Sequence, residues 1–232
     1  MKIDKLVFSI ALISSFLILL SLIYSPRNTE LDLNSRNIRK KHKLRDSISI
    51  EVATCISIVV PITFFVLCFR CVNIELEQEL QFYVCFLTCH LALTAFVENT
   101  KNIVGRLRPD FFNRCKPVMN RCTGNKKVVA DGRKSFPSGH SAITSCGFVY
   151  MVSFLNSKFV RQLNNKIINN NVSRLFLSFI FLTVPLVVGA SRYFDNKHFI
   201  SDILGGFLAG GVCASFFYRY FGEQLLKNNI EY

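Results

Sequence analysis

The sequence predicts an all-α polytopic membrane protein, a bundle of six transmembrane helices forming one domain over residues 1–232. Half of the 232 residues are hydrophobic, 23 of them are Phe, and the mean hydropathy is +0.33. The apolar residues gather in long runs, as membrane-spanning helices require, rather than being dispersed with a helical or strand period. The six runs lie at about residues 6–24, 52–69, 80–97, 141–155, 175–190 and 200–220.

Several of these runs carry further signals. No small-residue cleavage site follows the first run, which favours a retained span over a signal peptide. His90 lies inside the third run; an intramembrane His can be functional, but we favour a hydrogen-bonded His of the core. Close helix packing through small residues is expected in the last run, which contains Gly205, Gly206, Gly210 and Gly211.

The net charge of +13 could indicate a nucleic-acid partner. Its basic residues, however, lie in the loops between spans, and no basic–aromatic binding pattern accompanies them. Anionic lipid headgroups or phosphate substrates fit this charge better, and no nucleic-acid partner is expected. The basic loop 25–47 is interpreted as a solvated loop at the membrane surface.

Nine Cys residues are present, most of them in apolar runs where a free Cys behaves as a small hydrophobe. Only Cys115 and Cys122 share a polar loop, and they can pair if that loop is extracytoplasmic; the sequence leaves this open. No Cys-x-x-Cys signature is present, and Asp195 and Asp202 alone would make a poor metal site. The sequence therefore predicts no metal site.

An even number of spans places both termini on one side of the membrane. The loops 25–47, 98–137 and 191–199 then share the other side. Three clusters of polar residues, in the stretches 101–109, 137–140 and 191–202, therefore face one compartment.

The first cluster contains Lys101 and Arg108, followed by Pro109. Seven residues are two helical turns, so both cations can project from one face at the end of the third span. Arg binds phosphate oxygens with a bidentate fork, and Lys binds them as a point charge. Taken alone, the cluster is also a common basic flank of a membrane helix.

The second cluster is Pro-Ser-Gly-His, residues 137–140, immediately before the fourth span. At a helix start, Ser138 can donate its hydroxyl and Gly139 its main-chain N–H to an anion. His140 is then placed to exchange a proton with a leaving oxygen. An ordinary turn and helix cap would explain the same four residues.

The third cluster contains Arg192, His198 and Asp202. Arg192 would bind phosphate oxygens, and His198 would attack phosphorus through one ring nitrogen. Four residues separate His198 from Asp202, so on a helix the carboxylate can hold the proton of the other nitrogen. A structural Asp–His pair is the plain alternative for this cluster alone.

Together, the patterns Lys-x6-Arg-Pro, Pro-Ser-Gly-His and Ser-Arg-x5-His-x3-Asp resemble the type 2 phosphatidic acid phosphatase superfamily, the lipid phosphate phosphatases. The stretches 105–115 and 122–140 look like its diacylglycerol pyrophosphate phosphatase branch. Phe199 follows His198 where many relatives carry a second His, so headgroup contacts can differ. Arg133 and Lys134 lie outside the three motifs and are left as candidate substrate contacts.

This resemblance implies a helical-bundle phosphatase core that hydrolyses a lipid phosphomonoester without metal or other cofactor. His198 would form a phosphohistidine, His140 would protonate the departing alkoxide, and Asp202 would orient the nucleophile. The groups that bind phosphate would be Lys101, Arg108, Ser138, Gly139 and Arg192. Phosphatidate, lysophosphatidate, diacylglycerol pyrophosphate and sphingosine 1-phosphate are all compatible substrates in the membrane.

The resemblance also places the active face on the extracytoplasmic or lumenal side, in the plasma membrane or an endomembrane. Charge does not decide the side, because outside the loop 98–137 each side carries nine Lys and Arg residues. The sequon Asn171-Val-Ser173 lies on the opposite side, so native glycosylation there would reverse the topology. The sequence is compatible with a homo-oligomer.

Three other classes compete with a phosphatase. A non-catalytic lipid-phosphate binding or scaffold protein is the main alternative, although no motif residue is lost here. A vanadium-dependent haloperoxidase would share the phosphate pocket, but six spans argue against it. A transporter would carry its charges near the midplane, whereas here they lie at span ends.

Overall fold

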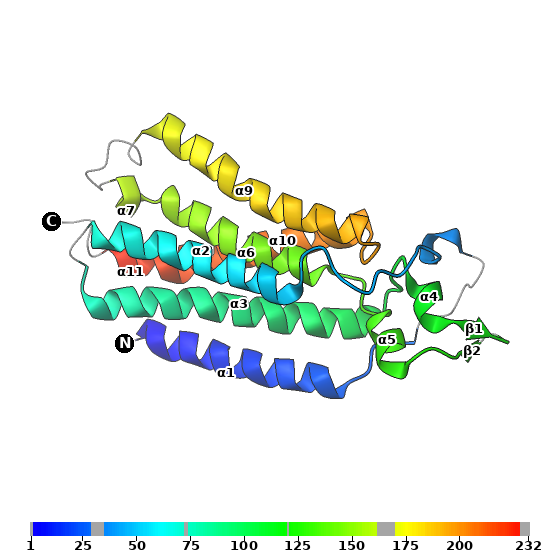
Figure 1. Cartoon of the computed structure of the whole chain (residues 1–232). Helices are drawn as coiled ribbons and strands as arrows, with labels where there is room; N and C mark the ends of the chain where they lie inside the picture. Colours follow the sequence, from blue (N-terminus) through cyan, green and yellow to red (C-terminus); the bar gives the residue numbers. More distant parts are fainter. Residues whose placement is uncertain (1, 29–34, 72–73, 120, 162–169, 228–232) are drawn as a thin grey trace.

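A computed structural model describes residues 2–28, 35–71, 74–119, 121–161 and 170–227. It forms a bundle of long helices with a small cap at one end (Figure 1). Chain direction alternates through α1 (Lys2–Ile23), α2 (Ile50–Arg70), α3 (Leu76–Val104), α6 (Gly139–Leu155), α9 (Asn171–Phe194) and α10 (Ile200–Phe217). The connections that follow α1, α3 and α9 therefore lie at the cap end, which confirms that the three motif clusters share one end of the bundle.

Within the described parts of the chain, five helices are long and apolar enough to cross a membrane: Lys5–Ile23, Ile50–Arg70, Leu76–Val104, Asn171–Phe194 and Ile200–Lys227. They expose large apolar side chains such as Leu22, Phe179 and Leu208, each about 70% exposed. The chain is thus an integral membrane protein. The expected count of six spans is not confirmed, because α6 has only 17 residues and is not among the five.

Helix α6 is nevertheless the centre of the bundle, packed against α2, α3, α9 and α10. Most of its residues are buried. Two glycines let its neighbours approach closely: a Cβ on Gly147 would overlap the Ser57 carbonyl of α2, and one on Gly210 of α10 would overlap the Ala142 carbonyl. The close packing expected for the glycines of α10 is therefore present at Gly210.

Aromatic side chains fill the core between α2, α3 and α6. Phe65, Phe82, Phe86 and Tyr150 are fully buried and meet mostly edge to face, with ring centroids 5.0–6.0 Å apart. His90 joins this group: it is buried and its Nδ1 lies 3.1 Å from the Phe86 carbonyl oxygen. The interpretation of His90 as a hydrogen-bonded core residue is confirmed.

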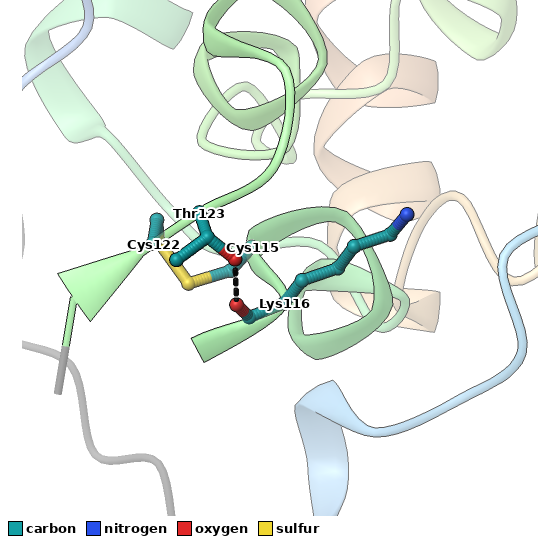
Figure 2. Close-up of a disulfide and its surroundings, with 4 residues drawn as sticks. All are labelled: Cys115, Lys116, Cys122 and Thr123. Atoms are coloured by element: carbon teal, nitrogen blue, oxygen red, sulfur yellow. Dashed lines mark hydrogen bonds between the residues drawn. A yellow bond between two sulfur atoms is a disulfide. The ribbon is translucent and has the colours of Figure 1, made fainter. Parts of the chain in front are cut away.

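The cap is formed by α4 (Phe111–Cys115), β1 (Pro117–Val118), β2 (Arg121–Cys122) and α5 (Lys126–Asp131). The two short strands are antiparallel, with Pro117 opposite Cys122. A disulfide joins Cys115 to Cys122, which answers the question that the sequence left open (Figure 2). Beside it, the Thr123 hydroxyl donates to the Lys116 carbonyl at 2.6 Å. The cap is thereby closed by one covalent and several hydrogen-bonded links.

The remaining elements are the 3-10 turn η1 (Arg36–Ile38), α7 (Lys158–Arg161), the π-helical turn η2 (Tyr218–Gly222) and α11 (Glu223–Lys227). The interpretation of 25–47 as a solvated surface loop holds for most of its described residues, which are exposed, but not for Ile38. Ile38 is 6% exposed and packs with Phe111 and Cys115 of the cap. Further along, the exposed loop reaches a motif residue, because the Asp46 carboxylate accepts a hydrogen bond from Arg192 at 3.0 Å.

Candidate active site

A polar cavity of about 960 Å³ lies where the cap meets the ends of α3, α6 and α9. Six of the eight site residues predicted from the sequence line it: Lys101, Arg108, Gly139, His140, Arg192 and His198. Ser138 and Asp202 are fully buried and do not line it. Three segments that are far apart in sequence thus converge on one cavity.

His198 lies in the turn between α9 and α10 and is 3% exposed. Its Nδ1 lies 2.7 Å from the main-chain carbonyl oxygen of Ser135. A carbonyl oxygen can only accept, so Nδ1 carries the proton and Nε2 keeps its lone pair. An imidazole in this tautomer can attack through Nε2.

The sequence assigned the Nδ1 proton to Asp202, and the structure differs on this point. The Asp202 Oδ2 atom is 3.8 Å from His198 Nδ1, an ion-pair distance rather than a hydrogen bond. The difference arises because Oδ2 already accepts from the Ser135 hydroxyl at 2.6 Å and from the Phe199 N–H at 2.9 Å. Asp202 is close to His198 but is held mainly by other groups.

Burial lowers the pKa of His198 to about 4. The cations Arg108 and Lys101 lower it further, while Asp202 raises it. The imidazole is therefore neutral at physiological pH, which is the form that a nucleophile requires.

Lys101 lies in the last turn of α3, and its ammonium pairs with Glu98 at 2.5 Å. The helix ends at Gly105, whose φ of +61° belongs to the left-handed region that glycine adopts without strain. Across the cavity, a Cβ on Gly139 would come within 3.0 Å of the Lys101 Nζ. The missing side chain of Gly139 thus leaves room for this cation.

Arg108 follows the end of α3 and is 9% exposed. Its Nε donates to the Asp131 carbonyl at 3.1 Å, and one terminal nitrogen donates to the Asp131 carboxylate at 3.0 Å. The same carboxylate accepts from Arg114 at 2.7 Å. Helix α5 of the cap therefore fixes the orientation of Arg108.

Arg192, in the last turn of α9, is 1% exposed. Its terminal nitrogens donate to the Ile48 carbonyl at 3.1 Å and to the Asp46 carboxylate at 3.0 Å. Its buried Nε has no hydrogen-bond partner among the described residues. Arg192 thus has a donor left for an anion.

Ser138 caps the N-terminus of α6, accepting from the Ser141 N–H at 3.4 Å. Its own N–H donates to the Asp202 carbonyl at 3.0 Å. The hydroxyl is therefore placed as a helix cap rather than as a group that faces the cavity. His140, the second residue of α6, does face the cavity, and its Nε2 lies 3.2 Å from the Ile48 carbonyl.

Positive charge predominates in the cavity, which is lined by seven Lys and Arg side chains and three carboxylates. Such an excess attracts anions. Of the two basic residues noted outside the motifs, Lys134 lines the cavity, and the guanidinium of Arg133 lies over the Phe111 ring at 5.1 Å. Only Lys134 is thus placed as a substrate contact.

Sequence reasoning missed residues that support the motif side chains: Asp46, Arg106, Asp131, Ser135 and Lys197. Lys197 directly precedes His198 and is 5% exposed, and its ammonium donates to the Lys43 carbonyl at 2.6 Å. Its position beside a motif His was a usable signal. Asp46 and Asp131 lie in basic loops outside the three motifs, so their spacing gave no reason to predict that they support the site.

The helical membrane bundle and its cavity, lined by cations and two histidines, define an integral membrane protein with a candidate anion-binding site. The model of the PAP2 superfamily matches residues 82–225, more than half of the chain. The chain therefore belongs to the PAP2 superfamily. No solved structure matches the sequence.

Several curated relatives that match this chain are named as lipid phosphatases. The chain is 37% identical over 131 residues to "Lipid phosphate phosphatase 2" of Arabidopsis thaliana, covering 52% of the chain and 44% of the relative. It is 33% identical over 139 residues to "Diacylglycerol pyrophosphate phosphatase 1" of Saccharomyces cerevisiae, covering 54% and 47%. The matches thus span less than half the length of these relatives.

Proposed function

We propose that the chain is a lipid phosphate phosphatase. Its substrates would be phosphatidate and related lipid phosphomonoesters, or diacylglycerol pyrophosphate, and its products the dephosphorylated lipid and inorganic phosphate. The observation that carries the proposal is His198, a neutral imidazole with an unprotonated Nε2 in a cavity lined by cations. The names of the two relatives support the substrate class.

In the first step, the lone pair of His198 Nε2 attacks phosphorus and the bond to the lipid oxygen breaks. His140 gives a proton to this departing oxygen. Burial, together with the charge of Arg192, lowers the pKa of His140 to about 3 in the unliganded protein. A bound phosphate dianion raises this pKa, because opposite charges stabilise each other, so His140 would take up its proton with the substrate. The lipid alcohol leaves, and a phosphohistidine remains on His198.

In the second step, water attacks the phosphohistidine. His140, now neutral, accepts a proton from this water, the bond from phosphorus to His198 Nε2 breaks with its electron pair returning to Nε2, and inorganic phosphate departs. His140 thus acts as acid and then as base, and both steps use one cavity.

Charge on the phosphoryl oxygens would be stabilised by Lys101, Arg108 and Arg192, together with the Gly139 N–H at the start of α6. These groups supply the stabilisation that Mg²⁺ supplies in many phosphoryl-transfer enzymes, so the proposed reaction uses no metal ion or other cofactor. Ser138 would act by holding the start of α6.

The active face is proposed to be extracytoplasmic or lumenal. The Cys115–Cys122 disulfide of the cap supports this side, because disulfides persist in oxidising compartments. The sequon at Asn171 begins α9, at the opposite end of the bundle. Its glycosylation in cells would contradict this orientation.

Phosphate release from a panel of lipid phosphates in mixed micelles, with a chelator present, tests the proposal. We expect activity in the wild type and a loss of more than about 10³-fold in His198→Ala, since the nucleophile is removed. Full activity of His198→Ala would refute the nucleophile. If the folded wild type binds these lipids but releases no phosphate, a non-catalytic binding protein is the better description.

A further inference from the structure

Three residues behind the catalytic cavity form a closed ring of hydrogen bonds. The Ser135 N–H donates to the Arg106 carbonyl at 3.0 Å. The Ser135 hydroxyl donates to Asp202 Oδ2 at 2.6 Å, and the Arg106 guanidinium donates to Asp202 Oδ1 at 2.5 Å. Each residue thus contacts both others, and the Asp202 carboxylate is fixed through both of its oxygens.

This ring holds His198. The Ser135 carbonyl accepts from His198 Nδ1 at 2.7 Å, and Asp202 Oδ2 lies 3.8 Å from the same nitrogen. Both oxygens near the Nδ1 proton therefore belong to ring members. The orientation of the imidazole and the nearest negative charge depend on one small hydrogen-bonded unit.

Arg106 acts on this unit from outside the cavity. Its side chain is 37% exposed, does not line the cavity, and lies over the Phe199 ring with 4.6 Å between guanidinium carbon and ring centroid. The Ser201 hydroxyl accepts from it at 2.8 Å. Arg106 therefore reaches Asp202 but not the space where a phosphate would bind.

Positive charge develops on His198 when Nε2 forms its bond to phosphorus, because the Nδ1 proton stays on the ring. The bond from phosphorus to the leaving oxygen breaks at the same time, and that oxygen keeps the electron pair. A carboxylate 3.8 Å from Nδ1 stabilises the developing cation. Among the described residues, Arg106 and His198 are the two ion-pair partners of this fully buried carboxylate.

We propose that Arg106 and Ser135 are positioning residues of the phosphatase reaction: they hold the Asp202 carboxylate and the His198 imidazole in the arrangement that the attack requires. This inference rests on the proposed function. It assigns Asp202 an indirect role, in which the carboxylate stabilises charge while a main-chain carbonyl fixes the tautomer.

Steady-state kinetics of Arg106→Ala, Arg106→Lys and Ser135→Ala provide the first test. We expect kcat to fall about 10–100-fold in Arg106→Ala and Ser135→Ala, as is usual for groups that orient an active-site residue, with KM within about twofold. Arg106→Lys should recover most of kcat, because an ammonium can still pair with Asp202. The matched control is Arg121→Ala, which removes an exposed arginine of the cap and should leave both constants unchanged.

The second test is independent of turnover. Nitrogen-15 NMR of histidine-labelled protein reports the protonation of each His198 nitrogen, and we expect Arg106→Ala and Ser135→Ala to change its shifts while Arg106→Lys preserves them. A KM increase with unchanged kcat would make Arg106 a substrate contact and overturn the proposal. An activity loss that only follows loss of folded protein, with unchanged His198 shifts, would also overturn it. Wild type without lipid phosphatase activity would refute the proposed function instead, while the NMR still tests the ring.

Discussion

At the residue scale, the proposed chemistry depends on which nitrogen of His198 carries a proton. The Ser135 carbonyl selects the Nδ1–H tautomer, and burial keeps the ring neutral. A solvent-exposed His titrates near 6.5, so lowering the pKa of His198 to about 4 keeps the proposed nucleophile neutral over the whole physiological range. The site therefore does not rely on a separate base to activate its nucleophile.

This state can be measured directly, since the chain has only four histidines. In a nitrogen-15 NMR titration, with His198→Asn used for assignment, His198 should stay neutral from pH 8 down to about 5 and take up its proton as the pH approaches 4. Its unprotonated nitrogen should be Nε2. A midpoint near 6.5, or an Nε2–H tautomer, would contradict the arrangement.

The sequence predicted the residues that line the cavity better than the residues that hold them. Spacing identified Lys101, Arg108 and His198, because each motif has a fixed length. Spacing could not identify the Ser135 carbonyl, since a main-chain group has no signature in the sequence. It also could not connect Arg108 to Asp131, which lies 23 residues away on a helix of the cap.

At the scale of elements, close packing of α6 against α10 positions the second and third motifs. At Gly210 an added Cβ would overlap the main chain of α6, at Ala142 and Cys146. At Gly211 it would meet only side-chain atoms at 3.7 and 3.9 Å, an ordinary contact. Gly210 and Gly211 are thus adjacent in sequence but differ in the space around them, so the same substitution at each can be compared directly.

Gly210→Ala should therefore destabilise the protein by about 1–3 kcal/mol, because the helices must move apart to accept the methyl group. Gly211→Ala should change stability by less than about 0.5 kcal/mol or increase it slightly, since Ala favours the helix. Thermal unfolding in detergent compares the two variants. Equal melting temperatures would show that α10 does not approach α6 this closely.

Element boundaries show where hydropathy fails. The third span, predicted at 80–97, is helix from Leu76 to Val104, because the helix continues into a polar flank that hydropathy does not detect. Lys101 is therefore helical, but Arg108 lies beyond the helix end at Val104, so the prediction that both cations share one helical face is wrong. The loop 25–47 shows a different limit: most of its described residues are exposed, as its charges predicted, but the charges did not predict that Asp46 pairs with Arg192.

At the scale of the whole molecule, orientation in the membrane decides which compartment supplies the substrate. The disulfide lies at the cap end, while Cys71, exposed at the end of α2, lies at the opposite end. A cysteine therefore lies at each end of the bundle, as a disulfide at the cap end and as a free thiol at the other, and labelling can report which side of the membrane each end faces.

On intact cells or vesicles of matching orientation, a membrane-impermeant reductant followed by an impermeant maleimide should label Cys122, the more exposed partner of the disulfide. Cys71 should react only after permeabilisation. Mass spectrometry of the labelled peptides separates the sites. The reverse pattern would place the cavity in the cytosol and contradict the proposed orientation.

The chain between α1 and α2 has a consequence for how this protein can be divided. The family match begins at residue 82, yet Asp46 and Ile48, which contact Arg192 and His140, lie before it. If only the matched segment were transferred into another membrane protein, Arg192 and His140 would lack their contacts with Asp46 and Ile48. The segment that matches the family model is thus shorter than the segment that forms the cavity. Transfer of an intact cavity would need the chain before residue 82 as well.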